Sequence, residues 1–314
     1  MNKISIIGTG SVGSTIAYTL AIQGLASEIV MIDINNEKAA GEALDIQQGI
    51  PFSGPCSIYA GSYADAKGSD IVIITSGIAR KAGQTRLELA QINVDVTKTI
   101  IPDITKNAPD ATYIIVSNPV DILTYTFHKY SGLPERQIIG SGTILDTARV
   151  RAKLSEFYNI SQANVHAYVF GEHGDSSFVP WSVANISNIP IAQCDTVFAG
   201  SKAPDSSLNF EEIERYVKES GSKVIARKGA TFYAVSISVC HICKCILSGI
   251  DTTMTVSTMM HGDYGIDDVC LSTLSLVGKN GYKHNISISL TDDELAKLHK
   301  SANTLMDVIK AVKI

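Results

Sequence analysis

The sequence predicts an α/β fold in which an N-terminal doubly wound parallel sheet is followed by a C-terminal α+β domain. Two observations support this prediction. Short apolar runs alternate with helical segments as far as residue 140, which is typical of a parallel sheet buried on both faces. After Gly142 this alternation ends. We therefore place one domain at residues 1–141 and a second at residues 142–314.

Length and composition limit the classes to which the chain can belong. A chain of 314 residues suits two domains or one large α/β unit. Its net charge of -5 argues against nucleic-acid or membrane partners attracted by bulk charge. No apolar run reaches the roughly 18 residues of a membrane span, and the chain opens directly into a strand, so we expect no signal peptide. Six cysteines in such a chain indicate reduced thiols and a cytoplasmic location.

The first strand, at residues 3–7, leads into a glycine-rich turn and then into a helix. Gly8 permits a tight bend, Gly10 lets the backbone approach a pyrophosphate, and Gly13 lets the helix pack on the strand. The helix would direct its positive dipole end at the phosphates. Glycines that serve only helix packing are the structural alternative.

A second strand, at residues 28–32, ends in Asp33. This acid lies twenty residues after Gly13, where a carboxylate can bind the ribose hydroxyls of NAD. Strand, glycines, helix, strand and acid together predict a Rossmann domain with NAD as the cofactor. S-adenosylmethionine is the alternative ligand for such a glycine-rich turn and acid.

The alternation continues through two more buried strands, at residues 69–75 and 112–116, which end at Ser76-Gly77 and Ser117-Asn118. In doubly wound sheets ligands bind beyond these carboxyl ends. Helices are expected at residues 37–48, from 87 toward 101, and after Pro119.

The loop at residues 78–86 is cationic and contains Gly83, a composition that suits a mobile lid over a binding site. A solvated basic turn is the alternative.

The second domain is expected to begin with a helix at residues 143–151. Asp146 and Arg149 are three residues apart and project from one face of it, although a surface salt bridge would have the same spacing. The apolar run 167–170 predicts a buried strand, and the loop that follows carries His173 between two glycines and two acids.

The remaining segments predict a polar surface helix, an apolar helix, short β-like runs and a terminal helix with Thr291 as N-cap and Glu294 in a capping box. These lie at residues 201–216, 228–248, 251–276 and from 291 onward. The apolar helix contains Cys240, Cys243 and Cys245. We interpret them as packing residues, with a zinc site as the alternative.

These residues together predict hydride transfer to a carbonyl. Such a transfer leaves an alkoxide that needs a proton, and His173 can supply it. Asp146 would hold the ring and stabilise the imidazolium. Arg149 would bind a substrate carboxylate, and Arg86, delivered by the lid, would polarise the carbonyl. This chemistry requires no metal.

The chain resembles the L-lactate/L-malate dehydrogenase family over essentially its whole length, and is most similar to its bacterial-type L-lactate dehydrogenases. The motifs that carry the resemblance are residues 8–13 with Asp33, Thr85-Arg86, and residues 117–121, 145–149 and 171–175. The resemblance implies the same roles for His173, Asp146, Arg149 and Arg86. It also implies that the cofactor site includes Val12, Lys38, Tyr63, Gly77, Val116 and Ser141, and that Asn118 touches both cofactor and substrate.

Within this family the sequence points mainly to an NAD-dependent L-lactate dehydrogenase that acts on pyruvate. Glu172 before the histidine and Thr231 beside the substrate are typical of the lactate branch. Arg80 is not, because lactate enzymes usually have glutamine there and malate enzymes have arginine. An L-malate dehydrogenase that acts on oxaloacetate is therefore the alternative.

The resemblance also implies an effector site. Arg151 and His166 match the positions that bind fructose 1,6-bisphosphate in allosteric bacterial lactate dehydrogenases, which are tetramers. We therefore expect a homotetramer, with ordinary surface residues as the alternative interpretation. Outside enzymes, an NAD/NADH sensor would not need His173, Asp146 and Arg149 together, and a structural protein would need none of them.

Overall fold

Six parallel strands form the N-terminal part of the structure, a computed structural model that describes residues 2–79, 83–201 and 207–314. Their order in the sheet is β3-β2-β1-β4-β5-β6, the doubly wound order of a Rossmann fold, which confirms the predicted α/β class. The strands are β1 (Lys3–Ile7), β2 (Glu28–Ile32), β3 (Ser57–Ala60), β4 (Ile71–Ile74), β5 (Thr112–Ile115) and β6 (Ile138–Gly140). The sequence pattern did not predict β3, because this four-residue edge strand buries only one side chain fully.

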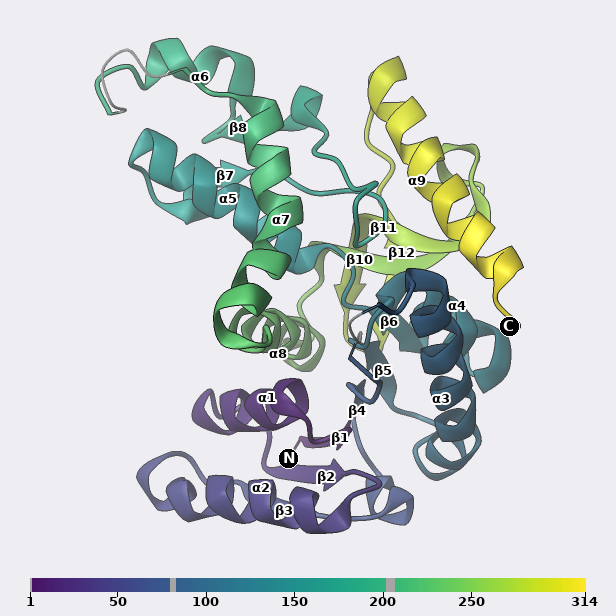
Figure 1. Cartoon of the computed structure of the whole chain (residues 1–314). Helices are drawn as coiled ribbons and strands as arrows, with labels where there is room; N and C mark the ends of the chain where they lie inside the picture. Colours follow the sequence, from purple (N-terminus) through teal and green to yellow (C-terminus); the bar gives the residue numbers. More distant parts are fainter. Residues whose placement is uncertain (1, 80–82, 202–206) are drawn as a thin grey trace.

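Helices cover both faces of this parallel sheet, as Figure 1 shows. They are α1 (Ser11–Ile22), α2 (Asn36–Gly49), α3 (Arg86–Asn107) and α4 (Val120–Ser131), with short 3-10 turns η1 (Ile50–Phe52), η2 (Tyr63–Ala66) and η3 (Glu135–Gln137). The helix expected from residue 87 toward 101 runs further and includes Pro102. A capping box of Thr85 and Glu88 fixes its start at Arg86.

The C-terminal half extends the same sheet with antiparallel strands. Ser257 of β10 pairs with Gly140 of β6, so that β10, β11 and β12 continue the sheet beyond its parallel part. The elements of this half are α5 (Ile144–Tyr158), α6 (Ile191–Val197), α7 (Phe210–Lys228), α8 (Tyr233–Ser248), α9 (Asp292–Ala311), β7 (Val165–His166), β8 (Asn185–Ile186), β9 (Ile189–Pro190), β10 (Thr252–His261), β11 (Asp267–Gly278), β12 (Gly281–Asn285), η4 (Gln162–Asn164), η5 (Trp181–Val183) and η6 (Asp263–Gly265). The capping box of Thr291 and Glu294 opens α9, as expected.

The strand expected at residues 167–170 does not form. Phe170 makes only an isolated bridge to Phe178, and β7 ends at His166. Side chains of α5 and of its N-cap residue, Thr143, take the place of a neighbouring strand. The Thr147 hydroxyl accepts the N–H of Val169 at 2.9 Å, and the Thr143 hydroxyl donates to the Val169 carbonyl at 2.5 Å. The run is apolar because it is buried, and its backbone is satisfied by a helix.

Two expected helices have different limits. The helix expected at residues 201–216 begins only at Phe210, and residues 202–206 lie outside the described part of the chain. The helix expected at 228–248 is interrupted, because α7 ends at Lys228 and Gly229 has a positive φ of 86°. The interruption places Thr231 between α7 and α8.

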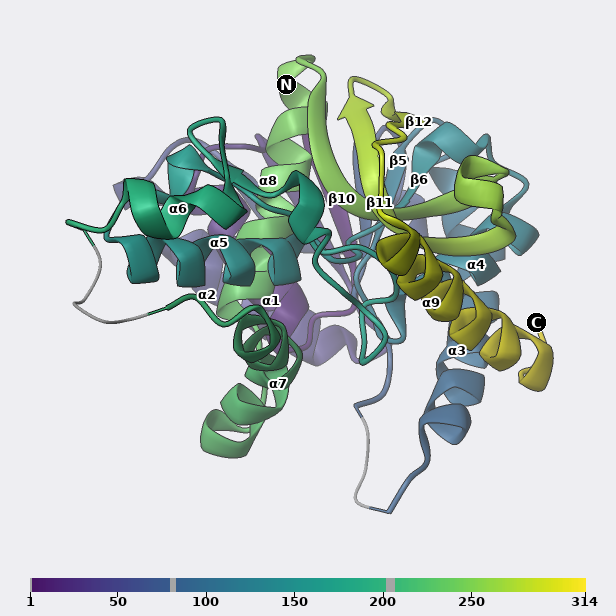
Figure 2. The same cartoon turned by 90° about the horizontal axis from the view of Figure 1, so that it is seen from above.

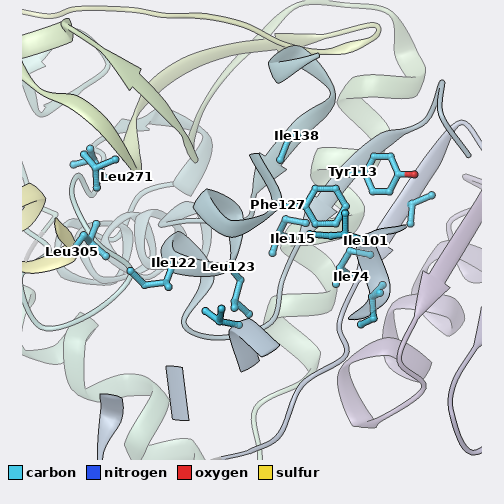
Figure 3. Close-up of a cluster of buried hydrophobic side chains, with 14 of the residues drawn as sticks. Ile74, Ile101, Tyr113, Ile115, Ile122, Leu123, Phe127, Ile138, Leu271 and Leu305 are labelled. Carbon is cyan, nitrogen blue, oxygen red and sulfur yellow. The ribbon is translucent and has the colours of Figure 1, made fainter. Parts of the chain in front are cut away.

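Two hydrophobic cores lie on opposite faces of the large sheet. On one face α1 and α8 pack together over the strands. On the other, α3, α4 and α9 cover them, and Figure 2 shows α9 beside α4. Figure 3 shows this second core, where the rings of Tyr113 and Phe127 are 5.0 Å apart and Leu271 and Leu305 join from β11 and α9. The C-terminal segments are thereby fixed to the parallel sheet.

Candidate active site

The glycine-rich turn connects β1 to α1 in the expected close packing. A Cβ on Gly13 would overlap the carbonyl oxygen of Gly8, so only glycine lets this helix approach the strand end. Gly8 has a positive φ of 98°, and Gly10 faces open space. The turn therefore leaves room beside the first turn of α1, where backbone N–H groups can bind an anion.

Asp33 lies at the carboxyl end of β2 and is tied to this turn. Its carboxylate accepts hydrogen bonds from the Thr9 amide at 2.6 Å, the Thr9 hydroxyl at 3.1 Å and the Asn35 amide at 2.9 Å. Burial raises the pKa of Asp33, but these hydrogen bonds outweigh it and the pKa is lowered overall. Asp33 is therefore a carboxylate at neutral pH, half-buried beside the glycines.

The other residues expected at the cofactor also lie near this edge of the parallel sheet. Val116 and Ser141 follow β5 and β6, and Gly77 lies just beyond β4. The hydroxyl of Ser76, before Gly77, is buried and has no hydrogen-bond partner among the described residues. Lys38 in α2 and Tyr63 in η2 interact electrostatically with Asp33. The carboxyl ends of the strands, the glycine-rich turn and the unpaired Ser76 hydroxyl together fit a dinucleotide.

A series of polar contacts joins His173, Asp146 and Arg149. Nδ1 of His173 is 2.6 Å from Oδ2 of Asp146, and Oδ1 of Asp146 is 2.7 Å from Nη1 of Arg149. Asp146 and Arg149 project from one face of α5, as predicted, but the pair is not a surface salt bridge because Asp146 is buried. The side chain of His173 is 29% exposed, and of its two ring nitrogens only Nδ1 is hydrogen-bonded to another described residue. One ring nitrogen is thus held and the other is available.

The charges near His173 together favour its protonated form. The charge of Asp146 raises the pKa of His173 to about 9, against the effect of burial. Burial likewise opposes the charge of Asp146, but His173 and Arg149 lower its pKa overall. At neutral pH the pair is therefore an imidazolium and a carboxylate.

A cavity of about 270 Å³ collects the candidate residues from distant parts of the chain. It is lined by Val116, Asn118, Ser141, Asp146, Arg149, His173 and Thr231, and also by Asp175, Lys218 and Ser222, to which the sequence analysis assigned no role. The carboxyl end of the sheet, α5, the His173 loop and the break between α7 and α8 therefore meet at one place.

Arg86, at the start of α3, reaches the His173 loop. Its guanidinium lies 2.6 Å from the carboxylate of Asp175, two residues after His173, and both side chains are mostly exposed. Arg86 is not among the residues that line the cavity. Arg80, the residue expected to choose between substrates, lies outside the described residues.

The two residues expected to bind an effector lie on α5 and β7. Nε of Arg151 donates to the carbonyl of Ala167, the residue after His166, at 3.1 Å, and its guanidinium lies over the ring of Tyr168. His166 is exposed. The cysteines expected to pack in a helix do so, since Cys240, Cys243 and Cys245 are buried in α8.

Two residues that the sequence analysis missed hold the His173 loop. Oδ2 of Asp121 accepts the amide of His173, and the Ser301 hydroxyl accepts the amide of Glu172. Asp121 belongs to the motif at residues 117–121, which drew attention to it without indicating a role. Ser301 lies in a helix 129 residues away and no sequence signal identifies it.

Two family models match this chain. A model described as "lactate/malate dehydrogenase, NAD binding domain" matches residues 2–140, and one described as "lactate/malate dehydrogenase, alpha/beta C-terminal domain" matches residues 143–314. Proteins named L-lactate dehydrogenase are also similar. The one from Acetivibrio thermocellus is 45% identical over 100% of this chain and 98% of its own length. The one from Thermoanaerobacterium saccharolyticum is 44% identical over the full length of both.

Solved structures agree with these matches. A lactate dehydrogenase named MGS-M5, from a deep-sea metagenome library of the Medee basin, superposes with a TM-score of 0.93 at 36% identity, covering 99% of this chain and 98% of its own. The minor L-lactate dehydrogenase of Enterococcus mundtii superposes with a TM-score of 0.94 at 36% identity, covering 100% and 99%.

Proposed function

Because the chain belongs to the lactate/malate dehydrogenase family along nearly its whole length, we propose that it is an NAD-dependent L-lactate dehydrogenase, which moves a hydride reversibly between NADH and pyruvate. The observation that carries this proposal is the series of contacts from Arg149 through Asp146 to His173 in the wall of the cavity. The names of the full-length relatives support lactate over malate.

The N-terminal half fits NAD, which supplies the hydride when it is bound. The close packing at Gly13, the open space at Gly10 and the ionised Asp33 match the needs of a pyrophosphate and a ribose. We propose that the cofactor site comprises Gly8, Gly10, Val12, Gly13, Asp33, Lys38, Tyr63, Gly77, Val116, Asn118 and Ser141.

His173 is the proposed proton donor to the carbonyl oxygen of pyruvate, and it takes the proton back when lactate is oxidised. Its contact with Asp146 holds the ring by Nδ1 and leaves Nε2 to face the substrate. Asp146 also stabilises the imidazolium, which keeps the donor form populated at neutral pH.

Arginines would hold and polarise the substrate. Arg149 uses one guanidinium nitrogen on Asp146, which leaves its other donors for the carboxylate of pyruvate. Asn118 and Thr231 line the same cavity and would contact the rest of the substrate. Arg86, from the neighbouring helix start, would release Asp175 and polarise the carbonyl.

L-malate dehydrogenase activity is the second candidate, because of one residue. Arg80 could form two charge-assisted hydrogen bonds with the second carboxylate of oxaloacetate. Against it, Glu172 and Thr231 are typical of the lactate branch of the family that the chain resembles. We propose that Arg80, a substrate-binding residue on this account, makes the enzyme tolerant of oxaloacetate without changing its main substrate.

An oligomer with an anionic effector is a further part of the proposal. Arg151, which donates to the carbonyl of Ala167, and His166, the residue before Ala167, are the proposed ligands of fructose 1,6-bisphosphate at a subunit interface of a homotetramer. Large apolar side chains exposed on the adjacent helices α1, α2 and α8 support an assembly of copies: Tyr18, Ile22, Leu44, Tyr233 and Ile237.

The cytoplasm is the proposed place of action, because the six cysteines are free thiols, as is usual in a reducing compartment. Among the described residues, no helix has the length and apolar character needed to cross a bilayer.

The substitution His173→Ala tests the proposed function. It is expected to reduce pyruvate turnover by roughly 10²- to 10⁴-fold, because general acid–base groups contribute about that much, while NADH still binds. Stopped-flow absorbance and NADH fluorescence titration measure the two effects. A variant that keeps more than about a third of the wild-type kcat would contradict the role of His173.

A further inference from the structure

The backbone of the His173 loop is held from two sides by buried side chains. Oδ2 of Asp121, in the first turn of α4, accepts the His173 amide at 2.8 Å. The hydroxyl of Ser301, in α9, accepts the Glu172 amide at 2.7 Å and lies 2.9 Å from the hydroxyl of Ser176. Asp121 is 2% exposed and Ser301 is fully buried. The ring contact with Asp146 is therefore only one of the contacts that orient His173.

A carboxylate is a costly choice for this position. Burial raises the pKa of Asp121 to about 6, against the Ser257 hydroxyl and the His173 amide, which lower it. An asparagine would accept the same amide hydrogen through its side-chain oxygen, without a buried charge. The hydrogen bond alone therefore does not require an acid, whereas the neighbouring imidazolium benefits from one.

We propose that Asp121 is a positioning residue for the reaction: it fixes the backbone of His173 and keeps a second negative charge, besides Asp146, next to the ring. The proposal rests on the proposed function, in which His173 gives the proton. It assigns the two carboxylates different tasks. Asp146 holds the ring nitrogen, whereas Asp121 holds the main-chain amide and adds to the negative field that retains the proton.

Several charged groups around His173 affect its protonation, so the test must separate the effect of Asp121 from theirs. The charges of Asp146 and Arg149 in α5 and of Asp121 in α4 act on the ring. Glu172 of the same loop acts on Asp121, Asp175 and Lys218 line the same cavity, and α9 contributes the neutral Ser301. Asp121→Asn removes one of these charges and keeps the shape and an acceptor oxygen. Ser301→Ala removes the other amide acceptor and changes no charge, so it is the matched control.

The test measures the protonation of His173 directly, by NMR titration of the histidine ring protons. The chain has seven histidines, and the spectrum of His173→Gln assigns the signal. We expect Asp121→Asn to lower the midpoint of His173 by roughly one pH unit, because a nearby opposite charge typically shifts a pKa by this much or more. Ser301→Ala should leave the midpoint within about 0.2 units, and should lower kcat/KM for pyruvate several-fold through a looser loop.

Two results would overturn the proposal. One is an unchanged midpoint in Asp121→Asn. The other is an equal shift in Ser301→Ala, which would attribute the effect to loosening rather than to charge. A further control is Ser5→Ala, which removes a buried hydroxyl of β1 that is hydrogen-bonded to Ser69. It should change neither the His173 midpoint nor kcat/KM for pyruvate. A wild-type enzyme that reduced no 2-oxo acid would refute the proposed function instead, and the NMR midpoints would still report on Asp121.

Discussion

Asp146→Asn is the substitution whose effect follows most directly from the structure. Asp146 is buried, and its charge is the largest cause that raises the pKa of His173 from 6.5 to about 9. An amide can still accept a hydrogen bond from Nδ1, so the ring retains a partner. What is lost is the largest of the charges that stabilise the imidazolium, and burial then opposes the proton with only the weaker charge of Asp121 to offset it.

The size of the effect depends on pH. With a midpoint near 9, about nine tenths of His173 is protonated at about pH 8. With the ordinary value of 6.5, roughly 3% is protonated. If only the protonated form gives a proton to the substrate, pyruvate reduction at about pH 8 falls about 30-fold or more. Because a raised pKa matters least below the ordinary value, the deficit should shrink as the pH falls toward about 5.5.

The assay is kcat/KM for pyruvate with saturating NADH, measured from about pH 5.5 to 9.5. Glu156→Gln is the matched control, since it removes a carboxylate from the same helix where the side chain is 71% exposed and solvent screens the charge. We expect it to follow the wild type throughout. An Asp146→Asn enzyme within about twofold of wild type at about pH 8, or a deficit that does not change with pH, would show that the charge of Asp146 does not keep His173 protonated.

Three further predictions concern the cofactor, the effector and the substrate. Gly10→Ala should weaken NADH binding roughly tenfold and leave the unfolding temperature within about 2 °C of wild type. Gly13→Ala, whose methyl group would overlap Gly8, should weaken binding and also lower the unfolding temperature. Fluorescence titration measures the binding and calorimetry the unfolding temperature, and equal effects of the two substitutions would contradict the separate roles of these glycines. Fructose 1,6-bisphosphate should lower KM for pyruvate, and Arg151→Gln should abolish this response without changing kcat in the absence of the bisphosphate. If the bisphosphate changes neither KM nor the assembly state of the wild-type enzyme, the proposed effector site is wrong. Arg80→Gln should reduce oxaloacetate turnover by roughly 10- to 150-fold and leave or improve pyruvate turnover; equal responses would mean that Arg80 does not read the second carboxylate.

The N-terminal half could be predicted well because its signals are local. The apolar runs that became β1, β2, β4 and β5 are buried on both faces, and such strands differ clearly from the segments between them. Asp146 and Arg149 could be placed on one helix face from their spacing alone. The strand predicted at residues 167–170 does not form, and the prediction was wrong because burial without a neighbouring strand gives the same apolar pattern as a strand.

The contacts that hold the backbone of the His173 loop could not be predicted from sequence patterns. Asp121 is 52 residues from His173, and Ser301 is 129 residues from Glu172. Nothing in the sequence near Ser301 distinguishes it from other helical serines. The hydrogen bond depends on how α9 crosses β11 and reaches the loop, which is decided by packing of the whole core.

The most direct test of the central claim is the ratio of kcat/KM for pyruvate to that for oxaloacetate, measured with NADH on the wild-type enzyme by loss of NADH absorbance. We expect turnover of both, with pyruvate the better substrate. A preference for oxaloacetate would make the protein a malate dehydrogenase, and no turnover of either substrate would contradict the catalytic site built around His173, Asp146 and Arg149.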